Sequence, residues 1–555
     1  MTHHMFEKHQ ALLTQAVAAI ESRGYWSPYP EGPRAYGDTA IEDGRKAFEA
    51  YRGAQFYLDQ PGVIDRGGQE VSPYGLPLNV SYPRCSADAL IAAGKAAMPV
   101  WIKAGADVRA GVCLEILARL NACSFEMAHA VMHTTGQPLM MAFQAAGPHA
   151  QDRGLEAVAC AWREMKHVPE TALWEKPQGK NPPIRMRKDF EIVGRGVALV
   201  IGCGTFPTWN TYPGLFAALA TGNAVIVKPH PHAVLPAAIT VRVIRQLLAE
   251  QGLDANLVSL CVTDQPEVTQ ALATHPAVAS VDFTGSNAFG QWLLEHCKQA
   301  QVYAELAGLN HVLIDSTSAY KAMLDNLAFT LCLYSGQMCT TTQAILVPQA
   351  GIETDEGHKS AEAVGTDLAA AIDRLLAKPE VACAVLGAIQ SDATLARIEQ
   401  ANTGQWGRVI RASQAIVHPD FPQARVRSPV LLACDAADEQ AYQSERFGPI
   451  AFVVTVADTD TAIALSERMV KQHGALTVGV YSTRQEVLQA ITEATWRSRV
   501  ALSINLTGPV FVNQSAAFSD YHATGGNPAA NASYADSAFV ANRFRVVQRR
   551  QHIAD

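Results

Sequence analysis

The chain has 555 residues, 48% of them apolar, so it is long enough to bury a large core divided among two or three domains. Its net charge of -8 and isoelectric point near 6.1 exclude a strongly basic nucleic-acid-binding protein or a polybasic membrane-surface protein. The sequence contains no run of about 18 uncharged apolar residues, so we expect no transmembrane helix. The first residues lack the apolar core of a signal peptide. The 11 cysteines show no CxxC or CxxH spacing, so we expect a cytoplasmic protein with reduced thiols and no zinc site.

The N-terminal part of the chain alternates irregular and helical segments. Residues 25–85 are rich in Gly, Pro, Tyr and Asp and predict an irregular arm with short helices. From 86 to 141 apolar residues recur at three- and four-residue spacing, which predicts helices, and TTGQP at 134–138 interrupts them. A further helix is predicted over 151–165. Residues 167–192 are charged and Pro-rich, and predict a solvent-facing strand or hairpin.

From residue 194 the pattern changes to short apolar runs that alternate with helices. Strands are predicted at 196–202, 222–229, 257–262 and 278–285, with helices at 235–250, 268–274 and 290–298. Strands that alternate with helices of roughly 10–15 residues predict a parallel, doubly wound sheet, which binds nucleotides at the carboxyl ends of its strands.

A second α/β region is predicted from 312 to about 505, with strands such as HVLID, QAILVP and IAFVVTV. The segment ANRFRVVQRR at 541–550 then alternates apolar and charged residues and resembles an exposed edge strand. Because soluble proteins normally cover such an edge, we expect a partner subunit to cover it.

The stretch SGQMCTTTQ at 335–343 contains a candidate nucleophile. Cys339 lies in a polar stretch that leads into a strand. We expect it to be partly exposed and close to backbone donors, the setting that a thiolate nucleophile needs. The alternative is a small buried apolar residue, which is the commoner fate of a single cysteine and fits Cys332 well.

A candidate general base lies in YAELAGLNHVLID at 303–315. Glu305 lies in an apolar, strand-like run, where a carboxylate is costly unless it has a partner. A desolvated glutamate has a raised pKa, which suits general-base work. The alternative is a glutamate that forms a salt bridge at the end of a strand.

Three stretches place polar residues at the expected nucleotide-binding edge. KPHPH at 228–232 ends a buried strand, from which Lys228 could reach ribose hydroxyls or a phosphate. FTGSNAFG at 283–290 places Gly285 and Ser286 at a strand-to-helix turn, where backbone N–H groups can bind a phosphate. ERFGPI at 445–450 by itself indicates only a turn, preceded by Glu445 and Phe447.

In this order, these stretches resemble the aldehyde dehydrogenase superfamily, from TTGQP to the C-terminal strand. The motifs ELAG, GQMC and FGP are the most specific, and Glu305 and Cys339 lie 34 positions apart, as the two catalytic residues do in typical members. The resemblance implies an α/β fold with three parts. These are an N-terminal arm with a doubly wound parallel cofactor domain (1–304), a catalytic domain (305–510), and a C-terminal return with an oligomerisation strand (511–555). Residues 167–192 would complete a small β oligomerisation element.

The resemblance also implies partners and roles. The partners are a small-molecule aldehyde and a second copy of the chain, in a homodimer or dimer of dimers, with no nucleic acid or membrane. Cys339 attacks the aldehyde carbon to form a thiohemiacetal, hydride passes to the nicotinamide, and Glu305 activates the water that hydrolyses the resulting thioester. The resemblance implies that Lys228 contacts the adenosine ribose of the cofactor. Gly285 and Ser286 would lie near the pyrophosphate, and Glu445 and Phe447 would contact the nicotinamide ribose and ring.

The coenzyme preference depends on the residues after the lysine. Members that prefer NAD often carry a glutamate three positions after it, which repels the 2′-phosphate of NADP. Here that position is Pro231, between His230 and His232. Loss of the anion and gain of two titratable cations favour NADP, with NAD as the alternative. If both histidines are merely solvated, this argument weakens.

The stretch CGTFPTWN at 203–210 departs from the family pattern. In typical members an asparagine in an Asn-Phe-Pro triplet donates to the oxyanion alongside the cysteine backbone N–H. It lies 18 positions before the asparagine of the GN that precedes the lysine strand. Counting 18 back from Asn223 reaches Thr205. Asn210 lies about 7.5 Å further along a helix, so we expect it to bond backbone at the helix start.

Losing one oxyanion donor typically costs about 2.7–4 kcal/mol in the barrier. The hydroxyl of Thr205 can still donate, directly or through water. Otherwise the substrate or another side chain supplies the donor, or activity is low.

The GTFPTWN variant and the long N-terminal part resemble, within the superfamily, the PaaN proteins of phenylacetate degradation. That resemblance implies oxidation of the semialdehyde released when the CoA-bound ring opens. One alternative is a CoA-acylating dehydrogenase, against which Glu305 argues because those enzymes commonly lack the general base. The other is a binding or scaffolding protein with weak or no activity, for which Thr205 is the best argument and the intact Cys339 and Glu305 are the arguments against.

Overall fold

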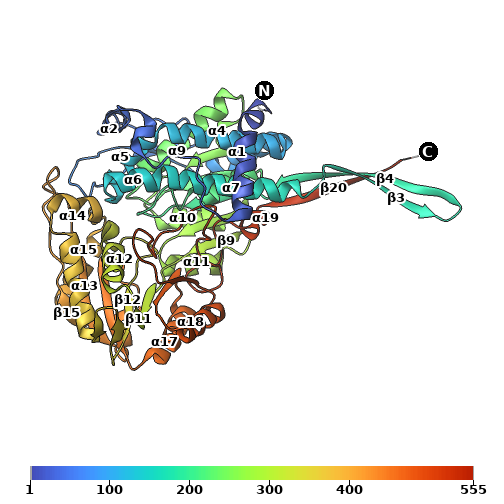
Figure 1. Ribbon diagram of the computed structural model, residues 1–555. Helices are drawn as coiled ribbons and strands as arrows, with labels where there is room; N and C mark the ends of the chain where they lie inside the picture. The colour runs from blue at the N-terminus through green and yellow to red at the C-terminus, as the bar shows by residue number, and fades with distance from the viewer. Residues whose placement is uncertain (1–2, 554–555) are drawn as a thin grey trace.

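The computed structural model describes residues 3–553. Two lobes and a long β arm make up the molecule, and the arm projects to one side of the N-terminal lobe (Figure 1). Within residues 3–553, no helix combines the length and the apolar character needed to cross a membrane.

A layer of helices forms the N-terminal part. Helix α1 (His3–Ser22), which no sequence prediction covers, packs against α4 and α7. The predicted helical stretches are present, and Gly136 ends α5 in the left-handed conformation with φ of 88°, so TTGQP separates two helices as predicted. The elements are η1 (Pro33–Tyr36), α2 (Ala40–Glu49), β1 (Val63–Gly67), β2 (Tyr82–Cys85), α3 (Ala87–Lys103), α4 (Gly105–Ala122), α5 (Ser124–Thr135), α6 (Leu139–Ala146) and α7 (Pro148–Lys166).

The first sheet is parallel, with strand order β7-β6-β5-β8-β9. Alternate residues of β5 enter different cores: Ala198 and Val200 pack with the N-terminal helices, and Val197 and Leu199 pack on the opposite face. Apolar layers on both faces confirm the predicted doubly wound sheet. The elements are β5 (Val197–Ile201), α8 (Tyr212–Ala220), β6 (Ala224–Lys228), α9 (Leu235–Glu250), η2 (Ala255–Leu257), β7 (Val258–Leu260), α10 (Pro266–Thr274), β8 (Val278–Thr284), α11 (Asn287–His296) and β9 (Gln301–Glu305).

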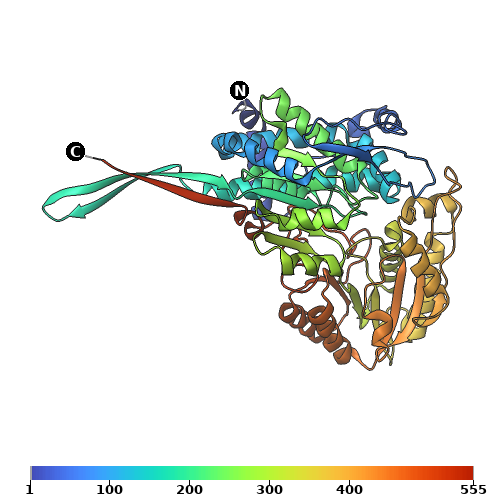
Figure 2. The same ribbon diagram turned by 180° about the vertical axis from the view of Figure 1, so that it is seen from behind.

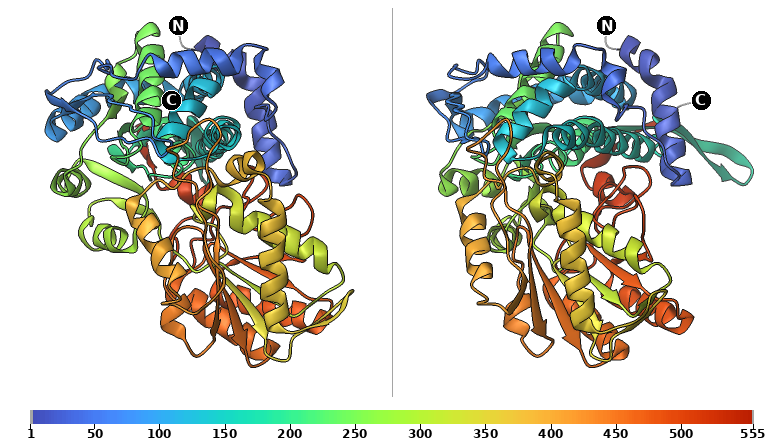
Figure 3. Two further views of the ribbon diagram at one scale, coloured as in Figure 1. Left: turned by 90° about the vertical axis from the view of Figure 1, so that its left-hand side faces the viewer. Right: turned by 60° about the vertical axis from the view of Figure 1, so that its left-hand side comes forward.

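The second lobe contains a seven-stranded sheet with the order β15-β16-β17-β12-β10-β18-β19, in which only β15 runs antiparallel to its neighbour. It lies below the N-terminal helices in both views of Figure 3. Its sheet strands are β10 (His311–Ile314), β12 (Ala344–Pro348), β15 (Arg408–Arg411), β16 (Val430–Asp435), β17 (Ile450–Val456), β18 (Thr477–Tyr481) and β19 (Ala501–Ile504). Its other elements are β11 (Ser316–Thr317), α12 (Tyr320–Cys332), η3 (Leu333–Gly336), β13 (Ile352–Thr354), β14 (Gly357–Lys359), α13 (Ala361–Leu375), α14 (Pro379–Leu386), α15 (Asp392–Asn402), α16 (Glu439–Tyr442), α17 (Thr459–His473) and α18 (Gln485–Ser498).

The arm is a three-stranded antiparallel sheet of β3 (Thr171–Gln178), β4 (Asn181–Gly194) and β20 (Phe544–His552). The predicted hairpin is therefore present. One edge of β20 pairs with β4 of the same chain along its whole length, so that edge does not need a partner subunit (Figure 2). Within residues 3–553 the other edge of β20 has no neighbouring strand. The predicted partner at this edge stays a prediction.

A buried ion pair joins the C-terminal return to the first sheet. Arg543, between α19 (Ser537–Ala541) and β20, donates from Nη1 and Nη2 to the two carboxylate oxygens of Asp282 in β8, at 2.8 and 2.6 Å. Both side chains are almost fully buried, and the guanidinium lies 4.2 Å from the ring centroid of Tyr303. The pair fixes the point from which β20 enters the arm.

Candidate active site

A cavity of about 670 Å³ is lined by residues of both lobes. Its walls include the carboxyl ends of β5, β6, β8 and β9, the edge at which doubly wound sheets bind nucleotides. The structure brings all eight predicted site residues to this one cavity: Thr205, Lys228, Gly285, Ser286, Glu305, Cys339, Glu445 and Phe447.

The nucleotide end of the cavity carries an unpartnered cation. Lys228 is the last residue of β6 and is buried, and its ammonium has no hydrogen bond or ion pair within residues 3–553. Burial lowers the pKa of Lys228, although Cys261 and Asp264 act in the opposite direction. Ser286 precedes α11, and its side chain makes no capping bond. A buried lysine without an anion and a free hydroxyl at a helix N-terminus fit the ribose and phosphate groups of a dinucleotide.

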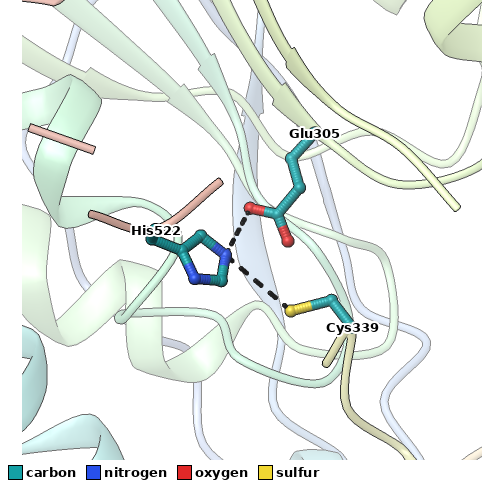
Figure 4. Close-up of side chains that lie close together, drawn as sticks. All are labelled: Glu305, Cys339 and His522. Atoms are coloured by element: carbon teal, nitrogen blue, oxygen red, sulfur yellow. Dashed lines mark hydrogen bonds and ion pairs between the residues drawn. The ribbon is translucent and has the colours of Figure 1, made fainter. Parts of the chain in front are cut away.

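Three side chains from distant parts of the sequence meet beside the cavity (Figure 4); Glu305 and Cys339 line it, and the buried His522 lies next to them. Glu305 ends β9, Cys339 lies between η3 and β12, and His522 lies in the return between β19 and α19. The Nε2 atom of His522 is 3.0 Å from Oε2 of Glu305 and 4.0 Å from Sγ of Cys339. Because a carboxylate only accepts hydrogen bonds, Nε2 carries the proton in this contact.

One carboxylate oxygen of Glu305 accepts hydrogen bonds from the protein, and the other accepts none from the described residues. Oε2 accepts from His522 and from Nδ2 of Asn210, the latter at 3.3 Å. Oε1 is buried and has no hydrogen-bond partner among the described residues. One carboxylate oxygen thus fixes the orientation, and the other is available to a water molecule or substrate atom.

Residues 81–539 match the model of the aldehyde dehydrogenase family. The chain belongs to that family. A solved structure, an NAD-dependent aldehyde dehydrogenase from Burkholderia multivorans, is 55% identical over the full length of both chains, with a TM-score of 0.98. An N-succinylglutamate 5-semialdehyde dehydrogenase from Chromobacterium violaceum is 26% identical, over 68% of this chain and 73% of its own. A vanillin dehydrogenase from Pseudomonas fluorescens is also 26% identical, over 66% of this chain and 72% of its own.

The titration of Glu305 in this aldehyde dehydrogenase differs from the sequence expectation. Burial raises the pKa of Glu305, but the charge and hydrogen bond of His522, the nearby Cys339 thiol and the charge of Arg153 together lower it below its ordinary value of 4.5. The expectation of a raised pKa is wrong because it considered only desolvation. Glu305 is therefore a carboxylate at neutral pH.

Cys339 is half-buried in the cavity wall, as predicted. Burial, followed by the negative charge of the nearby Glu305, raises the pKa of the Cys339 thiol well above its ordinary value. The free enzyme thus holds a thiol rather than the thiolate that the polar sequence suggested. Cys332, seven positions earlier, is fully buried in α12, as its apolar neighbours predicted.

Asn210 contributes to the site, which corrects its predicted structural role. Its side chain does not bond backbone at the start of α8; Nδ2 donates to Glu305, and Oδ1 lies 3.5 Å from Sγ of Cys203. No local pattern marks His522 as a site residue, because it lies 183 positions after Cys339 in a loop without a recognisable motif. The polar HATGG stretch, adjacent to a long irregular segment, was the only available signal.

Both lobes hold the loop that carries Thr205. Nε2 of Gln137, from the TTGQP stretch, donates to the carbonyl oxygen of Thr205 at 2.8 Å, and Nε2 of Gln390 donates to that of Gly204 at 2.6 Å. The Thr205 side chain lies in the cavity wall. Since the amide of Asn210 donates to Glu305, it is not aimed at a substrate oxygen in this structure, and the oxyanion role of Thr205 stays a prediction.

We predict that Thr205→Asn raises kcat for a simple aldehyde by up to about 100-fold, because one oxyanion donor is worth about 10²–10³ in rate. Steady-state formation of reduced coenzyme is the measurement. Thr205→Val is the matched control, and it should lower kcat because it removes only the hydroxyl. A fall of about tenfold or more in Thr205→Asn would instead show that the threonine is adapted to its substrate.

Proposed function

We propose that the protein oxidises an aldehyde to a carboxylic acid with NAD or NADP as coenzyme. The observation that supports this most directly is the single cavity, which joins Cys339 and Glu305 to the unpartnered Lys228. A scaffold without activity would have no reason to keep a half-buried thiol beside an oriented carboxylate. A CoA-acylating enzyme would have no need of Glu305 with one free oxygen.

The residues of this chain divide the reaction into two halves. The Cys339 thiol adds to the aldehyde carbonyl and gives a thiohemiacetal, whose oxygen receives the proton lost by sulfur. The coenzyme, held by Lys228, Ser286 and Glu445, supplies the hydride acceptor. Loss of hydride and of the hydroxyl proton leaves a thioester on Cys339. Oε1 of Glu305 then takes a proton from water, which attacks the thioester and releases the acid and the free thiol.

We infer that the protein uses NAD at least as well as NADP. Pro231 leaves the 2′-phosphate position without an anion, which admits NADP. However, burial, followed by the charges of His232 and Lys228, lowers the pKa of His230 to about 4, so this imidazole is uncharged at neutral pH. This corrects the part of the sequence argument that counted His230 as a cation. The Burkholderia structure, 55% identical, is of an NAD-dependent enzyme.

For the substrate we propose the CoA-linked semialdehyde released by ring opening in phenylacetate degradation. Its support is the GTFPTWN stretch, with threonine at the oxyanion position, together with the long N-terminal helical layer. Curated relatives at 26% identity act on a carboxylate-bearing semialdehyde and on an aromatic aldehyde, so these two classes are the competing substrates.

A side-by-side assay tests the function, the coenzyme and the substrate. Purified enzyme is given NAD or NADP with a CoA-linked semialdehyde, a carboxylate-bearing semialdehyde or an aromatic aldehyde, and reduced coenzyme is followed by absorbance. We expect the highest kcat/KM with the CoA-linked semialdehyde, and a value for NAD at least equal to that for NADP. No turnover with any aldehyde, together with no alkylation of Cys339 by iodoacetamide, would favour the scaffold.

A further inference from the structure

The side chains of Glu305, Cys339 and His522 offer one carboxylate, one thiol and one imidazole to the same point in space (Figure 4). One donor atom from each lies within 4.8 Å of the other two. His522 and Glu305 are 3% and 4% exposed, whereas Cys339 opens to the cavity. In the catalytic scheme His522 orients Glu305 and keeps it ionised, but that role does not require the imidazole to lie within 4.0 Å of the Cys339 sulfur as well.

We propose that these three side chains form an inhibitory binding site for a zinc ion in the free enzyme. Thiolate, imidazole and carboxylate are the ligands that zinc prefers, at about 2.3, 2.0–2.1 and 2.0–2.2 Å. In a tetrahedron these bond lengths place ligand atoms about 3.3–3.7 Å apart. The observed separations of 3.0 Å between nitrogen and oxygen and 4.0 Å between sulfur and nitrogen lie on either side of that range. Small side-chain rotations would equalise them.

The surroundings favour zinc over a hard cation. A thiol and an imidazole are poor ligands for Mg²⁺ and Ca²⁺, which take oxygen ligands. The oxygen of Glu305 near Nε2 is Oε2, and its other oxygen, Oε1, is buried without a partner among the described residues, so the carboxylate keeps lone pairs that no described group satisfies. Asn210 donates to the same carboxylate from outside and would orient it toward the metal. Three protein ligands leave the fourth position open for water, on the side of Cys339 that faces the cavity.

The backbone fixes His522 before any ion arrives. Residues His522 and Tyr534 exchange two backbone hydrogen bonds, at 3.2 and 3.1 Å. The imidazole stacks on the ring of Tyr534 and meets the edge of Trp209, with ring centroids 5.5 and 4.7 Å away. Such packing restricts the ring to one orientation, so binding costs little conformational entropy.

Zinc binding and aldehyde oxidation exclude each other. Zinc forms bonds to Sγ of Cys339 and Nε2 of His522; the thiol proton goes to solvent, and the Nε2 proton moves to a free Nδ1 or, where Nδ1 already carries one, to solvent. Nothing is oxidised or reduced. The sulfur lone pair and the Glu305 carboxylate are then occupied, so neither addition to the aldehyde nor activation of water can proceed. A chelator should reverse the inhibition.

Cobalt titration of the metal-free, coenzyme-free enzyme tests the site without relying on activity. Dialysis against a chelator is followed by stepwise addition of Co²⁺, with absorbance recorded through the near-ultraviolet and visible ranges. We expect one ion per chain, with a thiolate-to-cobalt charge-transfer band that is absent in Cys339→Ser. In His522→Gln, which keeps a donor to Glu305 but not a good metal ligand, the affinity should fall at least about 100-fold, since losing even an outer partner costs 10–100-fold.

Control variants separate this site from other donors in the same cavity. Cys203→Ser and His232→Asn remove a neighbouring thiol and an exposed imidazole and should leave the cobalt spectrum and affinity unchanged. His522→Phe repeats the ligand loss with an aromatic ring in the same packing, and circular dichroism checks the fold of each variant. Wild-type affinity in both His522 variants, or loss of the band in Cys203→Ser, would overturn the proposal. Full aldehyde oxidation by the zinc-loaded enzyme would also overturn it.

Discussion

Replacement of Glu305 by glutamine is expected to lower steady-state turnover by about 10²–10⁴-fold while preserving a first burst of reduced coenzyme, because general-base catalysis contributes that much. The glutamine carbonyl can still accept from His522, so the shape of the site is kept. The charge of Glu305 is also one of the causes that raise the pKa of Cys339. Its removal should not slow formation of the thioester. Stopped-flow absorbance would give a burst close to one equivalent per chain.

Cys339→Ala is the matched control for this experiment. It should show no burst, and its turnover should fall by about 10⁴-fold or more, because losing a covalent nucleophile removes the whole route. Steady turnover of Glu305→Gln within about threefold of wild type would show that another group activates the water.

His522→Gln should raise the pKa of Glu305 by removing the imidazole charge, and so move the acid limb of the deacylation rate to higher pH.

Replacement of Arg543 by methionine is expected to lower the free energy of unfolding by about 3–5 kcal/mol. The variant leaves the Asp282 carboxylate buried, at 4% exposure, without the two guanidinium hydrogen bonds that compensate it. Arg543 directly precedes β20, so loss of its ion pair with Asp282 should also make the β arm more mobile. Urea denaturation followed by tryptophan fluorescence gives the midpoint of the first transition.

The double variant Asp282→Asn/Arg543→Met tests the electrostatic reason. It removes both charges, so its loss of stability should be clearly smaller than that of Arg543→Met alone. Arg549→Met is a further control, because that residue pairs with Asp189 on the exposed arm and such pairs contribute roughly 0–1 kcal/mol. Equal losses for Arg543→Met and the double variant would point to packing rather than charge as the cause.

Much of the fold could be predicted from local patterns. The four strands from Val197 to Thr284 and the intervening helix α9 appear where apolar runs and helical spacing place them, because each buries its own residues in a regular layer. Helix α1 is an exception: its sequence has a weak apolar stripe, and it is held by packing on α4 and α7.

The sequence by itself determined eight residues of the cavity, because the motifs that resemble the aldehyde dehydrogenase family contain Glu305 and Cys339, and Lys228 and Ser286 end or follow predicted strands. Only the tertiary structure decided their protonation and partners. His522 and Asn210 lie 217 and 95 positions from Glu305, and no local pattern brings them to it. Desolvation alone raises the pKa of a buried carboxylate, whereas a neighbouring cationic or hydrogen-bonding group lowers it. The sign of the shift at Glu305 is therefore a property of the folded chain, set where the C-terminal return meets β9.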